Sequence, residues 1–387
     1  MKLFFIVEND EPYASGGGYY ALFKFAEHLA LMGNKVFVYG VLDLGWVKPG
    51  DGLSIVFRPR MPRTGRFRSK VDRVLSKFGA KWLLPFLIRR FRPDWILGVL
   101  THSAIKAESL GRRMGIPVAN FIYECPPWMN ETLGAVAFEK GYDAFARRLW
   151  EETRRAYLGS KVLFPNSRLS QRYNQMWLEG KPVADPIHPG IDPGQMPFGP
   201  VHNEPLRLDP DCKHVLSVGR LVEGKNIHQL IAAFRRLRAK AQLHICGAGP
   251  EMERLRREAS GSPAIHFHGY LSDADLWSLF RQCALVAYPS GFEGFGMPPM
   301  QALYFGKPCI ASDLEIFRSI FANRLEYFPL GDVDALAAEM DRLLADPEYC
   351  RQRGEAGRRF IIENFTWSVS AARIDKTLRE QGCNRNH

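Results

Sequence analysis

A carboxylate lies among glycines, prolines and aromatic residues in the stretch SGFEGFGMPPMQAL (residues 290–303). Gly294 and Gly296 allow the backbone to come close to a ligand, and a helix expected from about Pro299 would aim unpaired N–H groups at an anion. Because like charges repel, Glu293 suits neutral hydroxyl groups, such as those of a sugar, better than the anion itself. The alternative is that Glu293 caps the helix or is solvated.

Two basic residues lie in the stretch VGRLVEGKN (residues 218–226), which leaves an expected strand and enters an expected helix. Arg220 offers a planar fork of donors and Lys225 a mobile point charge, a combination that suits a diphosphate better than a carboxylate. The alternative is two solvated cations in a turn, in a chain with 52 Lys and Arg residues. Ligands of open α/β sheets bind where strands end, and this position favours a binding site.

Weaker candidates lie at similar positions. Gln301 lies inside the helix that follows Glu293 and can bind a second pair of hydroxyl groups. His102 and Glu124 each follow an expected strand and can handle the proton or hydroxyl of an acceptor, although a histidine at a strand end is often only structural. The glycine turn at residues 16–18 is not GxGxxG and lacks the acidic partner of a dinucleotide fold, which disfavours an NAD-dependent enzyme.

Short apolar runs alternate with amphipathic stretches, a pattern typical of βαβ units and parallel sheets. The pattern occurs twice, separated by the proline- and glycine-rich residues 181–210, which are the expected linker. It predicts an α/β protein with two doubly wound, Rossmann-like sheets that face a central cleft. The expected strands are 2–7, 35–41, 95–100, 117–123 and 161–165 in the first series, and 214–219, 242–247, 265–268, 285–288 and 308–312 in the second.

Length and composition restrict the class of protein. A chain of 387 residues that is 46% hydrophobic can bury a large core, and its length favours two domains. The seven scattered cysteines argue against a disulfide framework or a zinc site. The start MKLFFIVEND has too few apolar residues for a signal peptide, and no stretch approaches the roughly 18 apolar residues of a membrane span. We therefore expect a cytoplasmic protein.

The net charge of +11 is concentrated in residues 58–92, where twelve Lys and Arg residues accompany one acid, Asp72. Apolar residues recur among them at helical spacing, from Phe67 to Trp82. Such a helix can lie on an anionic membrane, although an amphipathic helix packed on the core fits the pattern equally well. We expect a peripheral contact with the inner membrane surface as one of these two outcomes. No recognition motif accompanies the charge, so nucleic-acid binding is not expected.

Four segments of the second half, in their order, resemble the retaining glycosyltransferases of the family-four group, which have the GT-B fold. They are VGRLVEGKNIHQLIAAF, LHICGAGPEMERL, the long run from IHFHGYLSDADLW to GKPCIASD, and PLGDVDALAAEMDRLLADP. In the first half, GGGYYALFKFAEHLALMGNKVFVY and RPDWILGVLTH are looser matches. The resemblance implies an acceptor-side domain at 1–200, a nucleotide-sugar-binding domain at 201–365, and a C-terminal helix at 366–387 that returns to the first domain.

The resemblance also implies roles for single residues. Arg220 and Lys225 would hold the diphosphate of the donor and stabilise the leaving nucleotide, and Glu293 would contact hydroxyl groups of the donor sugar. Gly17 would let the first domain approach the donor. Backbone groups that would support sugar and phosphate belong to Phe295, Gly296 and Met297.

Two positions depart from the family pattern. The second glutamate of the family, which binds the ribose hydroxyls, falls at Gln301, which lacks the charge and should bind ribose less tightly. The family often has a histidine near the donor, and Glu124 or its neighbourhood takes that place here.

The activity that the resemblance implies is that of a metal-independent, retaining hexosyltransferase in polysaccharide or glycolipid biosynthesis. A nucleotide-diphosphate sugar would be the co-substrate, without a further cofactor, and the acceptor would be a glycan, a lipid-linked or a small molecule. Fixed cations near the diphosphate would stabilise the charge that develops in the transition state. Two alternatives stay open: a nucleotide-sugar epimerase or phosphorylase on the same fold, and a non-catalytic sugar-nucleotide binding protein.

Overall fold

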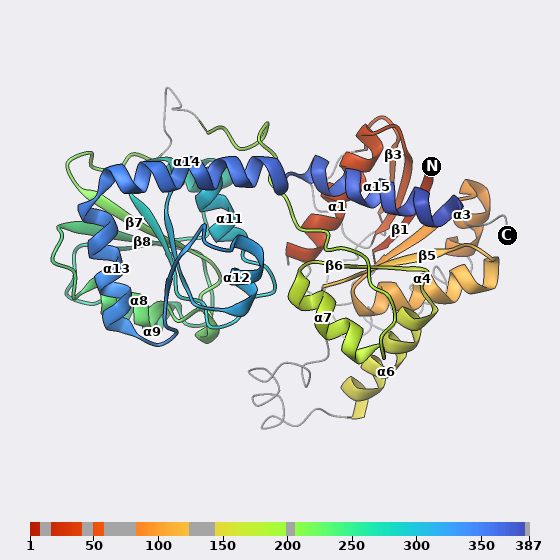
Figure 1. Cartoon of the computed structure of the whole chain (residues 1–387), viewed down its shortest axis with the longest axis horizontal. Coiled ribbons are helices and arrows are strands. Elements are labelled where there is room, and N and C mark those ends of the chain that lie inside the picture. The colour runs from red at the N-terminus through yellow and green to blue at the C-terminus, as the bar shows by residue number, and fades with distance from the viewer. Residues whose placement is uncertain (8–16, 41–48, 58–82, 124–143, 199–205, 384–387) are drawn as a thin grey trace, which may run out of the picture. The chain divides into compact units, whose positions relative to one another are not determined.

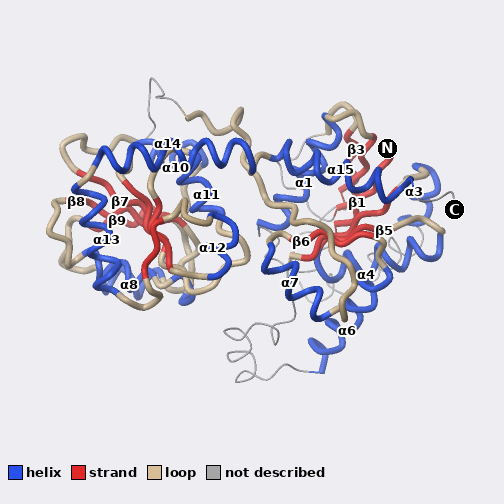
Figure 2. The backbone as a smooth tube through the Cα atoms, viewed as in Figure 1, coloured by secondary structure: helices blue, strands red, loops and turns tan. Residues whose placement is uncertain are grey.

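The computed structural model describes residues 1–7, 17–40, 49–57, 83–123, 144–198 and 206–383. It divides into two α/β units, one formed by Met1–Gly190 with Trp367–His387 and the other by Ile191–Thr366. In each unit, helices cover a central sheet (Figures 1 and 2). The boundary expected between residues 200 and 201 thus lies inside the second unit, and residues 181–210 include the point where the chain passes from one unit to the other.

The first unit contains a six-stranded sheet in the order β3-β2-β1-β4-β5-β6, and all its pairs are parallel. Five of these strands were predicted to within two residues at each end; β3, a short run before the basic block, was not. Their bounds are β1 Lys2–Val7, β2 Lys35–Gly40, β3 Leu53–Phe57, β4 Trp95–Val99, β5 Val118–Ile122 and β6 Val162–Pro165.

Strand β1 is apolar and buried from Leu3 to Val7 because helices cover both faces of its sheet. Leu3 and Phe5 pack in the same core as Trp367 of the C-terminal helix, whereas Phe4 and Ile6 belong to a second core on the opposite face. The helices of this unit are α1 Gly17–Leu31, α3 Leu84–Phe91, α4 Leu100–Met114, α6 Ala144–Gly159, α7 Arg168–Trp177 and α15 Trp367–Cys383.

Helix α15 packs against α1 at the C-terminal end of the chain (Figure 1). The Trp367 ring lies edge-on to Phe25, with 5.5 Å between ring centroids. At the other end of the contact, Asp375 accepts hydrogen bonds from Asn34 Nδ2 at 2.9 Å and Arg379 Nε at 2.7 Å. Aromatic packing and these polar contacts together make α15 part of the first unit.

The second unit also contains six parallel strands, in the order β12-β11-β10-β7-β8-β9. Counted from its own first strand, this is the same order as in the first unit. Strands β8 and β9 follow on one side of β7, and β10, β11 and β12 follow on its other side. The strand order therefore reverses between β7 and β10. Only the three-residue β12 was not predicted. The strands are β7 Lys213–Val218, β8 Ala241–Cys246, β9 Ile265–Gly269, β10 Leu285–Tyr288, β11 Cys309–Ser312 and β12 Glu326–Phe328.

The helices of the second unit begin at clear sequence signals. Asp332 and Asp346 accept N-cap hydrogen bonds from Ala335 N and Tyr349 N, each at 2.9 Å. The elements are η3 Glu223–Lys225, α8 Ile227–Phe234, α9 Met252–Glu258, α10 Asp273–Gln282, α11 Met297–Tyr304, α12 Glu315–Phe321, α13 Val333–Ala345 and α14 Pro347–Asn364. No helix in the described ranges is long and apolar enough to cross a membrane.

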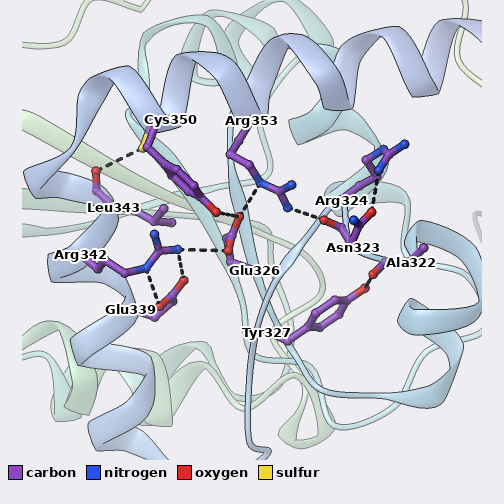
Figure 3. Close-up of polar contacts among 11 residues, drawn as sticks. Ala322, Asn323, Arg324, Glu326, Tyr327, Glu339, Arg342, Leu343, Cys350 and Arg353 are labelled. Atoms are coloured by element: carbon purple, nitrogen blue, oxygen red, sulfur yellow. Dashed lines mark hydrogen bonds and ion pairs between the residues drawn. The ribbon is translucent and has the colours of Figure 1, made fainter.

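A partly buried carboxylate joins the edge strand β12 to two helices (Figure 3). Glu326 accepts hydrogen bonds from Arg342 Nη2 of α13 at 3.1 Å, and from Arg353 Nε and the Tyr349 hydroxyl of α14 at 2.7 and 3.1 Å. Its side chain is only 13% exposed. The short edge strand, which pairs only with β11 among the described strands, is thereby also anchored through its side chain.

A chain of histidines crosses the other half of this sheet. His214, His244 and His268 lie on successive strands, on the face opposite the apolar core residues. His214 Nδ1 and His244 Nε2 are 3.0 Å apart, and His244 Nδ1 and His268 Nε2 are 2.9 Å apart. His214 Nε2 lies 2.8 Å from the Asp209 carbonyl, to which it donates. His214 and His244 can each donate one hydrogen bond and accept another along this row only while their rings are neutral.

We predict that acid destabilises the second unit through His244. Burial, followed by the charges of the neighbouring His268, His214 and His266, lowers the pKa of His244 to about 3. Below about pH 6.5 the unfolded chain binds a proton that the folded chain excludes, so the free energy of unfolding falls with pH by up to about 1.4 kcal/mol per pH unit for this residue. His244→Gln should flatten the slope measured by urea unfolding at about pH 7, 6 and 5. The exposed His102→Gln serves as control, and an unchanged slope in His244→Gln would contradict the prediction.

Candidate functional site

The two stretches that the sequence singled out follow neighbouring strands. Arg220 and Lys225 follow β7, whereas Glu293 follows β10, and Leu285 of β10 pairs with Val215 of β7. The strand order reverses between these two strands, and in open α/β sheets that point is the usual ligand site. Sequence position predicted that each stretch ends a strand, but only the structure makes the strands adjacent.

Hydrogen bonds tie the two loops together. Gly291 N donates to the Gly224 carbonyl at 2.9 Å, and Asn226 Nδ2 donates to the Pro289 carbonyl at 3.1 Å. A Cβ atom at Gly291 would lie 3.0 Å from Asn226 Nδ2, so a side chain there would crowd the amide that joins the two loops. The contact fixes Lys225 beside the loop that carries the carboxylate.

The centre of the site is an ion pair between Lys225 and Glu293. Glu293 Oε1 accepts from the Lys225 ammonium and also from the Tyr288 hydroxyl. Lys225 Nζ lies 3.4 Å from both the Tyr288 hydroxyl and Ser290 Oγ. The side chains of Lys225 and Glu293 are 18% and 11% exposed. The alternative in which Glu293 caps the helix or is solvated is therefore wrong.

Tyr288 and Ser290 belong to this cluster and were not among the predicted site residues. The Tyr288 side chain is buried, and burial, followed by the charge and hydrogen bond of Glu293, raises the pKa of its hydroxyl well above the usual value. It therefore stays protonated and acts as a donor. The sequence feature that could have identified Tyr288 is its position at the end of an apolar strand, directly before the glycine-rich loop.

Arg220 lies on a backbone held by a second glycine turn. Gly219 N donates to the Cys246 carbonyl and Leu221 N to the Ala248 carbonyl, each at 3.0 Å. The guanidinium is exposed and makes no ion pair or side-chain hydrogen bond with any other described residue. It is therefore available to a ligand.

Close backbone contact explains the glycines of the turn CGAGP (residues 246–250). A Cβ atom at Gly247 would lie 1.8 Å from the Gly219 carbonyl oxygen, and one at Gly249 would lie 2.2 Å from the Leu221 carbonyl oxygen. Gly247 also has a φ of 132°, which side chains rarely tolerate. The turn thus shapes the loop of Arg220 by packing.

The N-terminus of α11 differs from the prediction. The helix starts at Met297 rather than near Pro299, with Gly296 as its N-cap. Pro298 and Pro299 follow and have no N–H to donate. The first turn therefore offers an anion fewer donors than an ordinary helix, and attraction of an anion rests mainly on Arg220 and Lys225.

The backbone at Gly296 depends on glycine for two reasons. Its φ is 104°, and a Cβ atom would lie 2.7 Å from the Phe317 ring of α12. Phe295 is buried, and Gln301 is partly buried in the second turn of α11. The structure thus places Phe295 and Gly296 between Glu293 and the helix that begins at Met297 and carries Gln301.

The remaining predicted residues belong to the first unit. His102 does not end a strand: β4 ends at Val99, and His102 lies exposed in the first turn of α4. Its Nδ1 atom lies 3.5 Å from Thr101 Oγ1. Gly17 is the first residue of α1. Glu124 lies outside the described residues, as does most of the basic block, residues 58–82.

The described His, Cys, Asp and Glu side chains form no metal site. Within the described ranges, no group of three or more His, Cys, Asp or Glu side chains is placed to hold a metal ion. Five cysteines, Cys212, Cys246, Cys283, Cys309 and Cys350, are free, and Cys246, Cys283 and Cys309 are buried. Burial raises the pKa of the Cys283 thiol to about 11, so it is a poor nucleophile.

Comparison with known sequences identifies relatives. The profile of the family described as "Glycosyl transferases group 1" matches residues 201–360. The glycogen synthase of Mycobacterium tuberculosis is 30% identical over 294 residues, which are 73% of this chain and 68% of that protein. The MMP alpha-(1->4)-mannosyltransferase of Mycolicibacterium hassiacum is 32% identical over 157 residues, and this chain spans only 38% of its length.

Solved structures share the fold. Sucrose-phosphate synthase from Thermosynechococcus elongatus superposes with a TM-score of 0.80 at 20% identity, over 98% of each chain. Anabaena HepE in complex with UDP-glucose superposes with a TM-score of 0.67 at 15% identity, over 98% of this chain and 100% of HepE. With the match to glycogen synthase over more than two thirds of both sequences, these findings confirm the predicted family. The chain belongs to the group 1 glycosyltransferases and has the GT-B fold.

Proposed function

We propose that this glycosyltransferase is a retaining, metal-independent hexosyltransferase that uses a nucleotide-diphosphate sugar. The observation that carries the proposal is the cluster of Lys225, Glu293 and Tyr288 where β7 and β10 end, beside the exposed Arg220. The names of the relatives, a glycogen synthase and a mannosyltransferase, support sugar transfer, and the UDP-glucose complex of HepE supports the donor class.

The cations of the site suit the donor's diphosphate. Arg220 can bind two phosphate oxygens at once through its planar guanidinium, while Lys225 contributes a compact charge that is free to turn. Both follow β7, whose loop is held by the turn at residues 246–250. Since α11 offers few N–H donors, these two side chains supply most of the binding energy for the anion.

The same charges would promote departure of the nucleotide. As the bond between the anomeric carbon and the diphosphate breaks, negative charge grows on the diphosphate and the sugar becomes oxocarbenium-like. Arg220 and Lys225 would stabilise that negative charge more strongly in the transition state than in the ground state. Glu293, close to the sugar, would accept hydrogen bonds from its hydroxyl groups.

Retention would follow from attack on the face that the nucleotide leaves. The acceptor oxygen bonds to the anomeric carbon as the diphosphate departs, and the acceptor's proton passes to the departing phosphate oxygen. Glu293 is a poor nucleophile because its Oε1 atom already accepts from the Tyr288 hydroxyl. The acceptor would be a glycan, a lipid-linked molecule or a small molecule, and the protein would act in the cytoplasm.

We predict that Arg220→Ala with Lys225→Ala weakens nucleotide binding by about 100-fold, because two charge-assisted contacts are lost. Thermal shifts with UDP, GDP and ADP would first identify the nucleotide, and calorimetry would then give its Kd. Arg238→Ala with Lys240→Ala removes the same charge from exposed positions in the same unit and should match the wild type. Unchanged nucleotide affinity and sugar transfer in the first variant would rule out the proposed site.

A second prediction separates transfer from mere binding. Gln301→Glu should increase affinity for the donor severalfold, because a carboxylate accepts from both ribose hydroxyls. Turnover of UDP-glucose, GDP-mannose or ADP-glucose in this variant would support a transferase, whereas tighter binding without any turnover would favour the binding protein. An epimerised sugar formed from the donor alone would favour the epimerase.

We further propose that the first unit contacts an anionic membrane surface. Helix α3 continues the basic block and buries Leu84 and Ile88, but leaves Phe86 60% exposed. Arg89 and Arg90 are exposed on the same short helix. An exposed aromatic residue beside two cations can enter the interface of an anionic bilayer.

We predict that Phe86→Ser with Arg89→Ser reduces sedimentation with phosphatidylglycerol vesicles at about 0.1 M salt severalfold, because both the apolar and the charged contact are lost. Phosphatidylcholine vesicles and the pair Arg238→Ala with Lys240→Ala are the controls. Failure of the wild type to sediment with anionic vesicles at low salt would remove the membrane proposal.

A further inference from the structure

Tyr288 and Lys225 share a single carboxylate oxygen. Both donate to Glu293 Oε1, and Lys225 Nζ lies 3.4 Å from the Tyr288 hydroxyl and 5.6 Å from the centre of its ring. The Tyr288 side chain is only 4% exposed. The phenol is thus buried and contacts both charged groups of the ion pair.

Arrival of a diphosphate changes the charges around this pair. Lys225 is a single, compact cation on a flexible stem, so it is free to move to the phosphate oxygens. Ser290 Oγ, also 3.4 Å from Nζ, gives the ammonium a second neutral partner. Once Lys225 leaves, Glu293 loses its counter-ion while an anion approaches, and it needs another donor to keep its orientation.

We propose that Tyr288 is a positioning residue, whose hydroxyl keeps Glu293 directed at the donor sugar when Lys225 moves from Glu293 to the diphosphate. The inference rests on the proposed function, since it assigns a role within the same donor site. In the ligand-free protein, Lys225 neutralises Glu293. In the donor complex, Tyr288 remains as the fixed protein donor to that carboxylate.

Tyr288 is well placed for this role because it cannot easily move. It ends β10 and pairs with Ala311 in β11, so its backbone is part of the sheet. The Phe317 ring packs against it with 6.0 Å between centroids, and Phe317 in turn lies against Gly296. The raised pKa of the hydroxyl keeps it protonated. A rigid, neutral donor holds its hydrogen bond whether Lys225 is present or not.

Binding measurements with UDP and UDP-glucose test the role without a known acceptor. Tyr288→Phe removes only the hydroxyl, and we expect about a tenfold weaker Kd for UDP-glucose with the Kd for UDP within about twofold of wild type. If the thermal-shift panel selects GDP or ADP, then GDP-mannose or ADP-glucose replaces the probe. Tyr349→Phe is the matched control, because it removes a hydrogen bond from a tyrosine of α14 to another glutamate, Glu326 of β12.

A double-mutant cycle shows whether Tyr288 acts through the carboxylate. In the Glu293→Gln background, Tyr288→Phe should cause no further loss of UDP-glucose affinity, because there is no carboxylate left to position. A merely structural role would instead weaken UDP and UDP-glucose alike, and in both backgrounds.

The outcomes distinguish this inference from the proposed function. If the wild type binds UDP-glucose more tightly than UDP and Tyr288→Phe binds both with the same affinities as the wild type, the role of Tyr288 is overturned. The proposed function then stands. Equal losses for UDP and UDP-glucose overturn it as well. No binding of any of the three nucleotide sugars to the wild type overturns the proposed function and this inference together.

Discussion

The ion pair between two largely buried side chains, Lys225 and Glu293, is the feature on which the site depends. Lys225 and Glu293 are 68 residues apart in the chain, yet Glu293 Oε1 accepts from the ammonium. Such a pair is stable only if the remaining hydrogen-bonding capacity is met, and Tyr288 and Ser290 meet it. The pair keeps the site close to electrical neutrality until an anion arrives.

Topology creates this meeting of charges. Because the order of strands reverses between β7 and β10, the loops that follow these two strands lie next to each other. A backbone hydrogen bond from Gly291 N to the Gly224 carbonyl then sets their spacing. Glycine is required where backbones approach most closely, at Gly247 and Gly249 against the loop of Arg220 and at Gly296 against Phe317. Tight backbone packing therefore positions the charged side chains.

Polar groups away from the site stabilise the same unit. Glu326 anchors the short strand β12 to α13 and α14, and the neutral chain through His244 spans β7, β8 and β9. Glu326 and the row of histidines are polar groups that are stable inside the protein only while their hydrogen bonds are made. The stability of the unit therefore depends on pH and on substitutions at these residues. They support the sheet whose central strands carry the site.

The sequence alone determined the α/β class, because apolar and amphipathic segments alternate along it. The same alternation predicted ten of the twelve described strands, and it placed Arg220, Lys225 and Glu293 at strand ends. These features are local, because periodicity and turn residues act over a few neighbours. The short strands β3 and β12, the start of α11 at Met297 and the placement of His102 within α4 were not predicted. Only tertiary structure decided that β10 lies beside β7 and that Tyr288 contacts both Glu293 and Lys225, since such contacts depend on strand order and backbone approach between segments far apart in the chain.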